Sequence, residues 1–509
     1  MKQLLILSVI GLISFSCSTK KEASIAKLKQ AVSIHFDESL KPFYHGVASG
    51  DPLPDRVIIW TRVTPEDSVR SISVKWEVAE DEKFFSVYKT DTTTALASHD
   101  YTVKVDVDAL KPDHIYYYRF TALGKASIVG RTKTAPVATK DSLKFAIVSC
   151  SNYEWGYFNA YDKIADRAIL DAVLHLGDYI YEYGIGRYGD TTIGRLNIPS
   201  HEIVSLSDYR TRYSLYRLDK GLRRVHQQHP FIAIWDDHEI ANNSYATGAQ
   251  NHQPEEGDYQ KRKAAARQTY YEWMPIRESA ELYRSFSFGS LADVIMLDER
   301  LAGRSPEITD INNPDLNKKE RSMLGANQLQ WFENNLKSSK ATWKIIGNQV
   351  IFSDVYFEGV VPKMQRNLDS WDGFLIEKKK IVDFITQNKI SDIIITSGDT
   401  HGSWAIEAAV NITKKYSPFA IELGTTSISS ANGDEYKSSD SVKITEQALL
   451  KLNPHIKYVN DRDHGYLLLT LYPAKGKAEW FYVESLRTPE TKEYLGKKYF
   501  IAKGVSRLK

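Results

Sequence analysis

Between residues 143 and 401, short apolar runs repeatedly end at residues whose side chains can bind a metal ion. Each run has the length and composition of a buried strand. The runs are 143–149 before Cys150, 172–176 before Gly177 and Asp178, 231–235 before Asp236 to Glu239, 342–346 before Gly347 to Gln349, and 392–397 before Gly398 to His401. In α/β proteins, the carboxyl ends of strands meet at one sheet edge, where ligands bind. The recurrence therefore predicts one site at one edge, holding more than one metal ion.

The stretches between these runs have the pattern of helices, so strands and helices alternate from residue 138 to residue 509. We expect helices at 157–168, 207–228, 258–273, 326–336 and 377–387, with Ser207 or Asp208 capping the second. Further strands are expected at 291–297, 404–410, 419–423, 465–471 and 478–483. This order predicts a layered α/β domain with mixed sheets and with helices outside them.

Residues 43–137 have a different, all-β pattern. Strand-length runs at 56–63, 71–78, 101–107 and 115–122 are separated by turn residues. Short strands with such regular turns predict a small β-sandwich, in which Trp60 and Trp76 are most simply core residues. The predicted fold class is therefore α+β, with this N-terminal sandwich followed by the layered domain at 138–509.

The first residues have the features of an export signal. Lys2 is positive, the apolar run at 4–15 is too short to span a bilayer, and Ser16 precedes Cys17. Cys17 stands where a lipoprotein signal places its acylated cysteine, and plain signal cleavage is the alternative. We expect a signal peptide at 1–17, a polar tether at 18–42, and an exported protein in the periplasm or at the cell surface. Its only membrane contact would be a lipid on Cys17.

Charge and cysteine content narrow the possible functions. The 66 Lys and Arg residues are balanced by 64 Asp and Glu residues, and a formal net charge of +2 gives no reason to expect a nucleic-acid partner. The two cysteines are Cys17 and Cys150. If Cys17 is acylated or removed, Cys150 has no disulfide partner, and free thiols are rare in exported proteins. Cys150 is then either a small buried hydrophobe or, given its place at a strand end, a metal thiolate.

Two segments after the strands supply candidate ligands. Tyr181 follows Asp178 by three residues, and a phenolate with a thiolate and a carboxylate is typical of ferric iron. Its alternative role is packing in an aromatic loop. Adjacent Asp236 and Asp237 repel unless a cation, a cap or solvent separates them, and His238 can orient a substrate oxygen or donate a proton. The alternative for this segment is a solvated helix N-terminus.

A second pair of donors and one arginine complete the candidate site. Asp399 and His401 are two residues apart, so an extended segment points both to one side. Asn348 alone means little, because Gly-Asn is commonly a turn. Two metal ions sharing Asp178 would activate a water and clamp a phosphate ester, to which Arg300 can add a bidentate contact. The alternative for Arg300 is a surface salt bridge with Asp298 or Glu299.

The sequence contains no G-x-S-x-G elbow and no P-loop. Their absence argues against serine hydrolases and nucleoside triphosphatases.

The candidate residues stand in longer motifs that resemble one family. From residue 43 nearly to residue 509, the chain resembles the PhoD-type alkaline phosphatases, a branch similar to the purple acid phosphatases. The motifs are FYHGVASGDPLPDRVIIWTRV, SDYRTRYSLYRLD, IWDDHEIANN, YYEWMPIR, LDER, WKIIGNQV, SWDGF, SGDTHGSW and NPHIKYVNDRDHGY. The resemblance implies a β-sandwich followed by a metallophosphoesterase domain, export, and hydrolysis of phosphate esters with Fe(3+) and Ca(2+).

The resemblance also implies residue roles. Cys150, Asp178, Tyr181 and His401 match iron ligands; Asp178, Asp237, Asn348 and Asp399 match the calcium side; Arg300 and His238 match positions near the phosphate. Relative to the purple acid pattern, Cys150 stands in place of an Asp, Asp237 in place of an Asn, and Asn348 in place of a His. The motif GDTH also replaces GHxH of that pattern. Relative to the PhoD-type family itself, LDER differs from the typical LDTR-like form. Hard oxygen donors in place of imidazoles favour calcium over zinc or a second iron.

The sequence therefore predicts a secreted alkaline phosphatase that cleaves small phosphate esters with a metal-activated hydroxide and releases inorganic phosphate. One alternative is a phosphodiesterase or phospholipase-D-like enzyme that uses the same site. The other is a non-enzymatic surface binding protein in which the metals are structural.

Overall fold

The computed structural model describes residues 32–410, 412 and 415–509. The predicted signal peptide at 1–17 and residues 18–31 of the predicted tether lie outside the described residues. Among the helices in the described ranges, none combines the length and the apolar character needed to span a bilayer.

The N-terminal strands form two facing sheets, as the alternating sequence predicts. One contains β1 (Val47–Gly50), β2 (Val57–Arg62) and β5 (Thr102–Val107). The other contains β4 (Val87–Leu96), β3 (Ser71–Ala79), β6 (Ile115–Ala122) and β7 (Lys125–Ala126), with β8 (Gly130–Lys133) paired to β6. Every second residue of β6 is buried, and its Tyr118 and Phe120 pack in a core with Trp76. Alternation along the strand thus produces the inner face of a sandwich.

The sandwich shares a sheet with the larger domain. β1 pairs in parallel with β11 (Pro230–Ala233), where Ser49 lies opposite Pro230 and Gly50 opposite Phe231. At Gly50 a Cβ atom would lie 2.2 Å from the Pro275 carbonyl oxygen, so only glycine fits this junction. Trp60 is not part of the sandwich core: it packs in the large core and its Nε1 donates to the Glu272 carbonyl oxygen at 2.8 Å. The tryptophan therefore helps to join the two parts.

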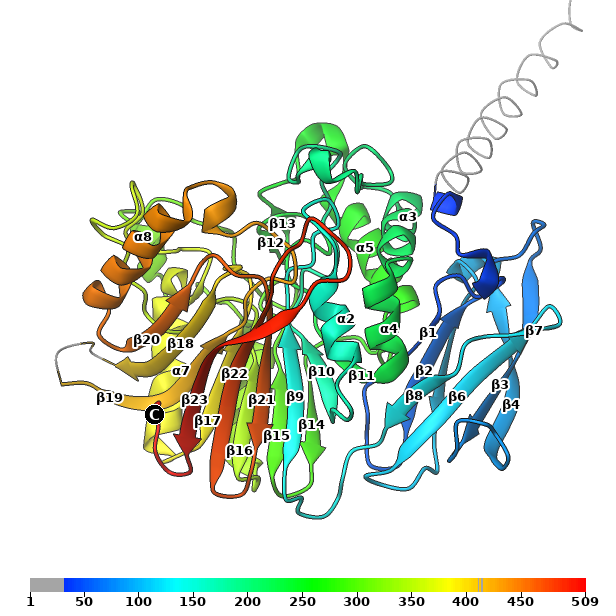
Figure 1. Cartoon of the computed structure of the whole chain (residues 1–509). Coiled ribbons are helices and arrows are strands. Elements are labelled where there is room, and N and C mark those ends of the chain that lie inside the picture. Colours follow the sequence, from blue (N-terminus) through cyan, green and yellow to red (C-terminus); the bar gives the residue numbers. More distant parts are fainter. Residues whose placement is uncertain (1–31, 411, 413–414) are drawn as a thin grey trace, which may run out of the picture.

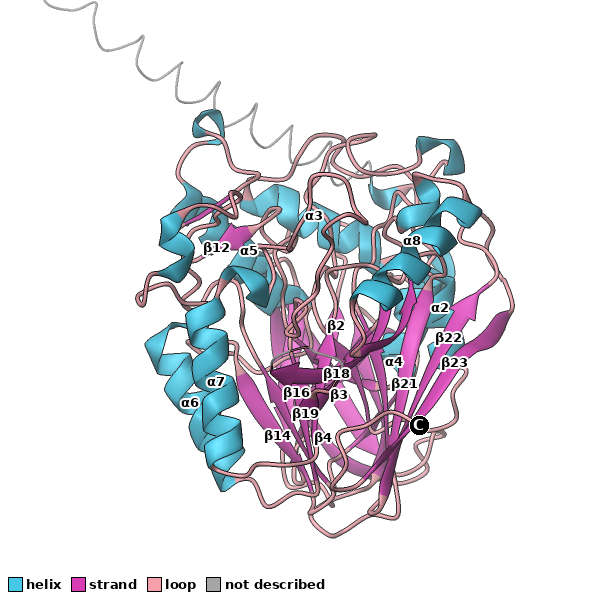
Figure 2. Ribbon diagram, turned by 90° about the vertical axis from the view of Figure 1, so that its left-hand side faces the viewer, coloured by secondary structure: helices cyan, strands magenta, loops and turns pink. Residues whose placement is uncertain are grey.

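Two mixed sheets face each other in the large domain (Figures 1 and 2). The nine-stranded sheet has the order β23 (Glu493–Ala502), β22 (Lys475–Val483), β21 (Gly465–Leu471), β9 (Leu143–Val148), β10 (Ala172–His175), β11, β1, β2 and β5. The seven-stranded sheet has the order β14 (Arg284–Phe288), β15 (Ala292–Met296), β16 (Trp343–Gly347), β17 (Ile393–Ser397), β19 (Ser417–Gly424), β18 (Ser403–Val410) and β20 (Ile456–Asn460). The rings of Phe145 and Phe288, one from each sheet, meet at a centroid distance of 5.0 Å in the core between them.

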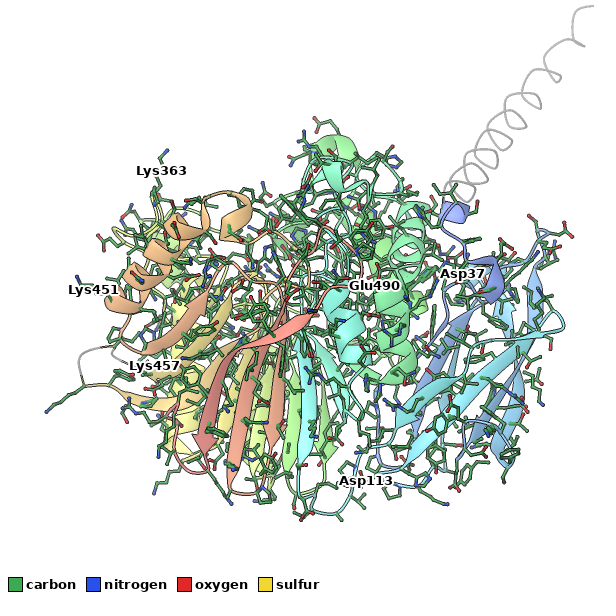
Figure 3. The ribbon with its side chains drawn as sticks, in the orientation of Figure 1. Asp37, Asp113, Lys363, Lys451, Lys457 and Glu490 are labelled. Atoms are coloured by element: carbon green, nitrogen blue, oxygen red, sulfur yellow. The ribbon has the colours of Figure 1, made fainter. Side chains whose placement is uncertain are left out.

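Helices flank these sheets. The helices α2 (Asn159–Ala165), α3 (Leu206–Arg217), α4 (Lys220–Gln228) and α5 (Tyr259–Trp273) lie beside the nine-stranded sheet, near the place where it passes into the sandwich (Figure 1). The helices α6 (Gly325–Ser338) and α7 (Leu375–Gln387) lie outside the seven-stranded sheet (Figure 2), and α8 (Ser439–Leu452) lies next to β20 (Figure 1). A two-stranded hairpin of β12 (Ser244–Tyr245) and β13 (Gly248–Ala249) lies apart from both sheets. Exposed charged side chains such as Lys363 and Lys451 lie at the edge of the molecule in the view of Figure 3.

The single helix predicted at 207–228 is wrong, because two helices, α3 and α4, occupy this stretch. The side chain of Asp219 accepts a hydrogen bond from the Leu222 N–H and starts α4 as its N-cap. The cap of α3 is Ser205 in a capping box with Asp208, and not Ser207 or Asp208. A carboxylate that satisfies free N–H groups favours a new helix start over continuation of the first helix.

Candidate metal centre

The parallel strands bring their carboxyl ends to one edge of the two facing sheets. β9, β10 and β11 are adjacent in the first sheet, and β15, β16, β17 and β19 are adjacent in the second. Every predicted site residue follows one of these strands. This strand order explains why the donors that follow the strands lie at one edge, as the sequence predicts.

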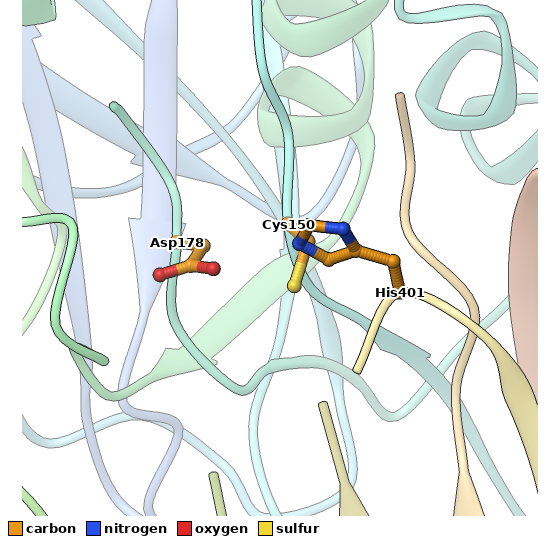
Figure 4. Close-up of side chains that lie close together, drawn as sticks. All are labelled: Cys150, Asp178 and His401. Carbon is orange, nitrogen blue, oxygen red and sulfur yellow. The ribbon is translucent and has the colours of Figure 1, made fainter. Parts of the chain in front are cut away.

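The side chains of Cys150, Asp178 and His401 converge, with one donor atom of each within 4.8 Å of the others (Figure 4). Tyr181 joins this group: its hydroxyl donates to Asp178 Oδ2 at 3.0 Å and lies 3.3 Å from His401 Nε2. Cys150, Asp178 and Tyr181 are at most 1% exposed. The four residues that the family resemblance assigns to iron thus form one compact set of S, O and N donors.

The backbone of this cluster is strained. Three residues of the cluster and the neighbouring Asp399 lie in the left-handed region, which residues other than glycine rarely occupy. Their φ values are 60° for Cys150, 55° for Asp178, 61° for His401 and 60° for Asp399. Such conformations cost about 1–3 kcal/mol each and occur mostly at functional sites. Gly177, at φ 107°, is needed in the same turn, because a Cβ there would lie 2.3 Å from the Asp236 nitrogen.

Asp178 is suited to bind a cation. Its Oδ1 is buried and has no hydrogen-bond partner among the described residues, and a buried carboxylate oxygen is costly without one. Burial, together with the nearby Asp237 and Asp236 carboxylates, raises the pKa of Asp178 well above its usual value. Burial and the charge of Asp178 likewise raise the pKa of the Cys150 thiol. Added positive charge at this point would favour the carboxylate and thiolate forms that bind metals.

A second cluster adjoins the first and contains Asp236, Asp237 and Asp399, again with donor atoms within 4.8 Å of one another. Burial raises the pKa of Asp236 to about 8 and that of Asp399 to about 7, although Arg300 opposes both shifts. Asp236 was recognised in the sequence as half of an adjacent pair but was not assigned as a ligand. Its Oδ2 is buried without a described hydrogen-bond partner, as is Asp178 Oδ1.

Arg300 lies inside this second cluster and not on the surface. It is fully buried: its Nε donates to Asp236, its Nη1 binds both carboxylate oxygens of Asp369 at 3.0 and 2.9 Å, and its Nη2 donates to Asp399 at 3.2 Å. The alternative of a surface salt bridge is therefore wrong. Asp369 was missed by the sequence analysis, although it stands directly before the SWDGF motif.

Asn348 lies at the end of β16, where its side chain is held by protein groups. Its Oδ1 accepts a hydrogen bond from the Trp371 indole at 2.9 Å, and its Nδ2 donates to the Val350 carbonyl oxygen. One lone pair of Oδ1 remains for a cation. The assignment of Asn348 as a calcium ligand stays a prediction.

His238 faces both clusters. One of its ring nitrogens lies within 4.8 Å of carboxylate oxygens of Asp178 and Asp237, and its ring centroid is 4.2 Å from that of Tyr181. Burial disfavours the charged imidazole, but Asp237 and Glu182 outweigh burial and raise the pKa of His238 well above its usual value. A positively charged donor at this position suits an anionic ester.

The loop 425–432 after β19 supports the first cluster and was missed by the sequence analysis. Ser430 donates to the Tyr181 hydroxyl at 2.6 Å. His401 Nδ1 bonds to the Ala431 carbonyl oxygen at 2.8 Å, which makes Nδ1 the donor and leaves the Nε2 lone pair for a metal. The available signal was the run TTSISSAN, another polar segment directly after an apolar strand.

The comparisons with known proteins cover nearly the whole chain. A family model described as PhoD-like phosphatase matches residues 145–480, and one described as PhoD-like phosphatase, N-terminal domain, matches residues 28–136. Alkaline phosphatase D of Bacillus subtilis (strain 168) is 39% identical over 462 residues, which cover 86% of this chain and 77% of that protein. A solved structure described as "Structure of PhoD" superposes with a TM-score of 0.83 at 35% identity and covers 92% of both chains.

Proposed function

Because this chain belongs to the PhoD-like phosphatase family and is therefore a hydrolase of phosphoric esters, we propose that it releases inorganic phosphate at an iron and calcium centre outside the cytoplasm. The observation that carries the proposal is the convergence of Cys150, Asp178, Tyr181 and His401. Sulfur, phenol oxygen and imidazole nitrogen beside one carboxylate match the donor preferences of ferric iron better than those of magnesium.

Calcium is proposed for the neighbouring oxygen donors. Asp237 and Asp399 lie in the second cluster, Asp178 lies between the two clusters, and Asn348 follows β16. Asp178 would contribute to both metal positions, because it is grouped with Cys150 and His401 on one side and with Asp237 and His238 on the other. When bound, the two metals would supply Lewis acidity, which makes water nucleophilic at neutral pH and neutralises charge on the ester.

The remaining residues would bind and orient the phosphate. The contacts of Arg300 with Asp236 and Asp369 fix its guanidinium group, and its Nη2 is directed toward Asp399. A fixed guanidinium stabilises the negative charge that develops during phosphoryl transfer without needing to reorganise. His238 would donate a proton or a hydrogen bond to an oxygen of the ester.

Export and lipid anchoring are part of the proposal. The sequence features at 1–17 support an export signal, with Cys17 as the acylated residue. Cys150 is a free, buried cysteine within the described residues, and a role as metal thiolate would account for a free thiol in an exported protein.

The test is elemental analysis of the purified mature protein, paired with hydrolysis of a chromogenic monoester and a chromogenic diester at alkaline pH, with and without added calcium. Iron near one per chain together with calcium-dependent turnover would support the centre, and the preferred ester would distinguish a phosphomonoesterase from the phosphodiesterase or phospholipase-D-like alternative. Zinc as the only metal in an active enzyme would contradict the iron and calcium assignment.

A further inference from the structure

We infer that Glu182 is the positioning residue for His238: its carboxylate fixes the orientation and the Nδ1–H of the imidazole and so presents Nε2 to the phosphate ester. The inference rests on the role proposed above for His238. Glu182 lies four residues after Asp178, in the segment that follows β10, and it is fully buried. No motif in the sequence analysis gave it a function.

Each oxygen of the Glu182 carboxylate has its own partners. Oε2 accepts the hydrogen bond from His238 Nδ1 at 2.7 Å. Oε1 accepts from the Asn242 backbone N–H and from Asn251 Nδ2, each at 2.8 Å. Because both oxygens are held, the carboxylate cannot rotate without losing a hydrogen bond in a buried site, at a cost of about 1–3 kcal/mol.

These contacts decide the chemistry of the imidazole. A carboxylate has no proton to donate at neutral pH, so Nδ1 must carry the hydrogen that lies between the two residues. Nε2 is then the nitrogen that remains for the reacting groups. Tyr181, whose ring centroid is 4.2 Å from that of His238, limits rotation of the imidazole on the other side.

The support for Glu182 reaches back to α5. Arg262, in α5, donates through Nη1 to the Asn251 carbonyl oxygen at 3.0 Å and through Nη2 to Glu202 at 2.8 Å. Asn251 Nδ2, which binds Glu182, also lies 3.2 Å from Glu202 Oε1. Glu202 thus belongs to the same hydrogen-bond network but makes no direct hydrogen bond to Glu182 or His238, its partners being Asn251 and Arg262. It provides a matched control.

The decisive substitution is Glu182→Gln, which keeps the shape of the side chain. The two N–H donors at the Oε1 position require an oxygen there, so the amide nitrogen of the glutamine must face His238 Nδ1. A donor then replaces the acceptor, so Nδ1 can be paired only if His238 gives up that proton and, with it, its positive charge. We expect kcat to fall about 10- to 100-fold, the usual effect of removing the partner that orients a functional histidine, while KM stays within about twofold. Glu202→Gln should change neither value by more than about twofold.

A double-mutant cycle separates positioning from a general structural effect. In the His238→Gln background, Glu182→Gln should cause no further loss of kcat, because Glu182 acts only through His238. Equal losses in the two backgrounds, or wild-type kcat in Glu182→Gln, would overturn the inference. Wild-type kcat in His238→Gln would overturn the proposed role of His238 and the inference with it. If kcat falls in His238→Gln but not in Glu182→Gln, the inference alone is overturned.

Elemental analysis and thermal unfolding of each variant show whether the metals and the fold are retained. If Glu182→Gln does not fold, Glu182→Asp replaces it in the same cycle. The shorter side chain keeps the charge but withdraws the acceptor from Nδ1, so kcat should again fall only where His238 is present. Unchanged kcat in folded Glu182→Asp would count against the inference.

Discussion

At the residue scale, Asp178 connects the two clusters of donors. It is grouped with Cys150 and His401 and also with Asp237 and His238, and its Oδ1 is buried without a described partner. Asp178→Asn removes the negative charge but keeps the volume. We expect kcat to fall by at least about 100-fold and the bound metal to decrease, because a metal clamp contributes several kcal/mol to catalysis.

The measurement is kcat with elemental analysis of the same preparation. Asp141→Asn, at an exposed position before β9 and so at the opposite end of that strand from Cys150, is the control and should retain both activity and metal. Full activity of Asp178→Asn with unchanged metal content would show that Asp178 is not a bridging ligand.

Arg300 contributes geometry as well as charge. Its three guanidinium nitrogens each contact a different carboxylate, Nε that of Asp236, Nη1 that of Asp369 and Nη2 that of Asp399, a planar pattern that a lysine ammonium cannot reproduce. Arg300→Lys should therefore lower kcat about 10- to 100-fold even though the positive charge is kept. Steady-state kinetics measures the loss.

The control for this substitution is Arg277→Lys, since Arg277 makes a similar two-bond contact with Asp106 at 2.9 Å, but on the sandwich side of the molecule. It should leave kcat unchanged. If the two variants behave alike, the role of Arg300 is only structural.

Residue types and spacing predicted the donors better than they predicted their partners. Cys150, Asp178 and His401 each lie within four residues of the end of an apolar run, so strand topology alone predicts that they meet. Asp369, Ser430 and Glu182 act through contacts between segments far apart in the chain. Such contacts depend on how loops fold back over the sheet edge, which no local pattern encodes.

At the element scale, the turn after β10 determines whether the site can form. Gly177 has φ 107°, and a Cβ there would lie 2.3 Å from the Asp236 nitrogen, a backbone atom that cannot move freely. Gly177→Ala should destabilise the protein by about 3 kcal/mol or more and lower kcat at least about 100-fold, because it displaces both Asp178 and Asp236.

Gly194→Ala is the matched control for Gly177→Ala. Gly194 also has a positive φ, of 80°, but an added Cβ would meet no atom within 4 Å. The substitution Gly194→Ala should lower the free energy of unfolding by about 1–2 kcal/mol, from backbone strain alone, and leave kcat unchanged. Equal effects of the two variants on kcat, measured alongside denaturant unfolding, would refute the steric argument.

Element prediction succeeded where the sequence pattern is local. The apolar strands β9, β10, β16 and β17 were located to within two residues, because uninterrupted apolar runs between turn residues are typical of buried parallel strands. β4 and β23 were missed because most of their residues are exposed or half-buried and give no continuous apolar run. The break between α3 and α4 depends on the single cap Asp219, inside a stretch whose overall pattern is helical.

At the scale of the whole molecule, the sandwich and the catalytic layers form one hydrogen-bonded body. The parallel pairing of β1 with β11 continues the nine-stranded sheet across the predicted boundary between residues 137 and 138. Sequence patterns could separate an all-β region from an alternating one. They could not predict this junction, because it depends on long-range strand pairing and on the fit of Gly50 against Pro275.

Buried neutral histidines should make the stability of the whole molecule sensitive to acid. His175 contacts the Tyr161 hydroxyl at 2.8 Å and His229 bonds to the Ile164 carbonyl oxygen at 3.1 Å, and both are at most 1% exposed. Burial lowers the pKa of each to about 3. In the unfolded chain the pKa of histidine is about 6.5, so between pH 6.5 and pH 3 the unfolded state binds more protons than the folded state.

The stability that these two histidines provide is complete above pH 6.5 and is lost as the pH falls toward 3. Well below pH 6.5, each histidine should lower the free energy of unfolding by about 1.4 kcal/mol per pH unit. Because the unfolded histidine is only half protonated at pH 6.5, the pair loses about 3 kcal/mol between pH 6.5 and pH 5.0. Denaturant unfolding of the metal-loaded protein at half-unit pH steps measures this slope. In His229→Gln, whose amide can still donate to the Ile164 carbonyl oxygen, the slope should be smaller by about 1.4 kcal/mol per pH unit. Because every other titrating group is common to both proteins, identical slopes would mean that His229 is not kept neutral by the fold.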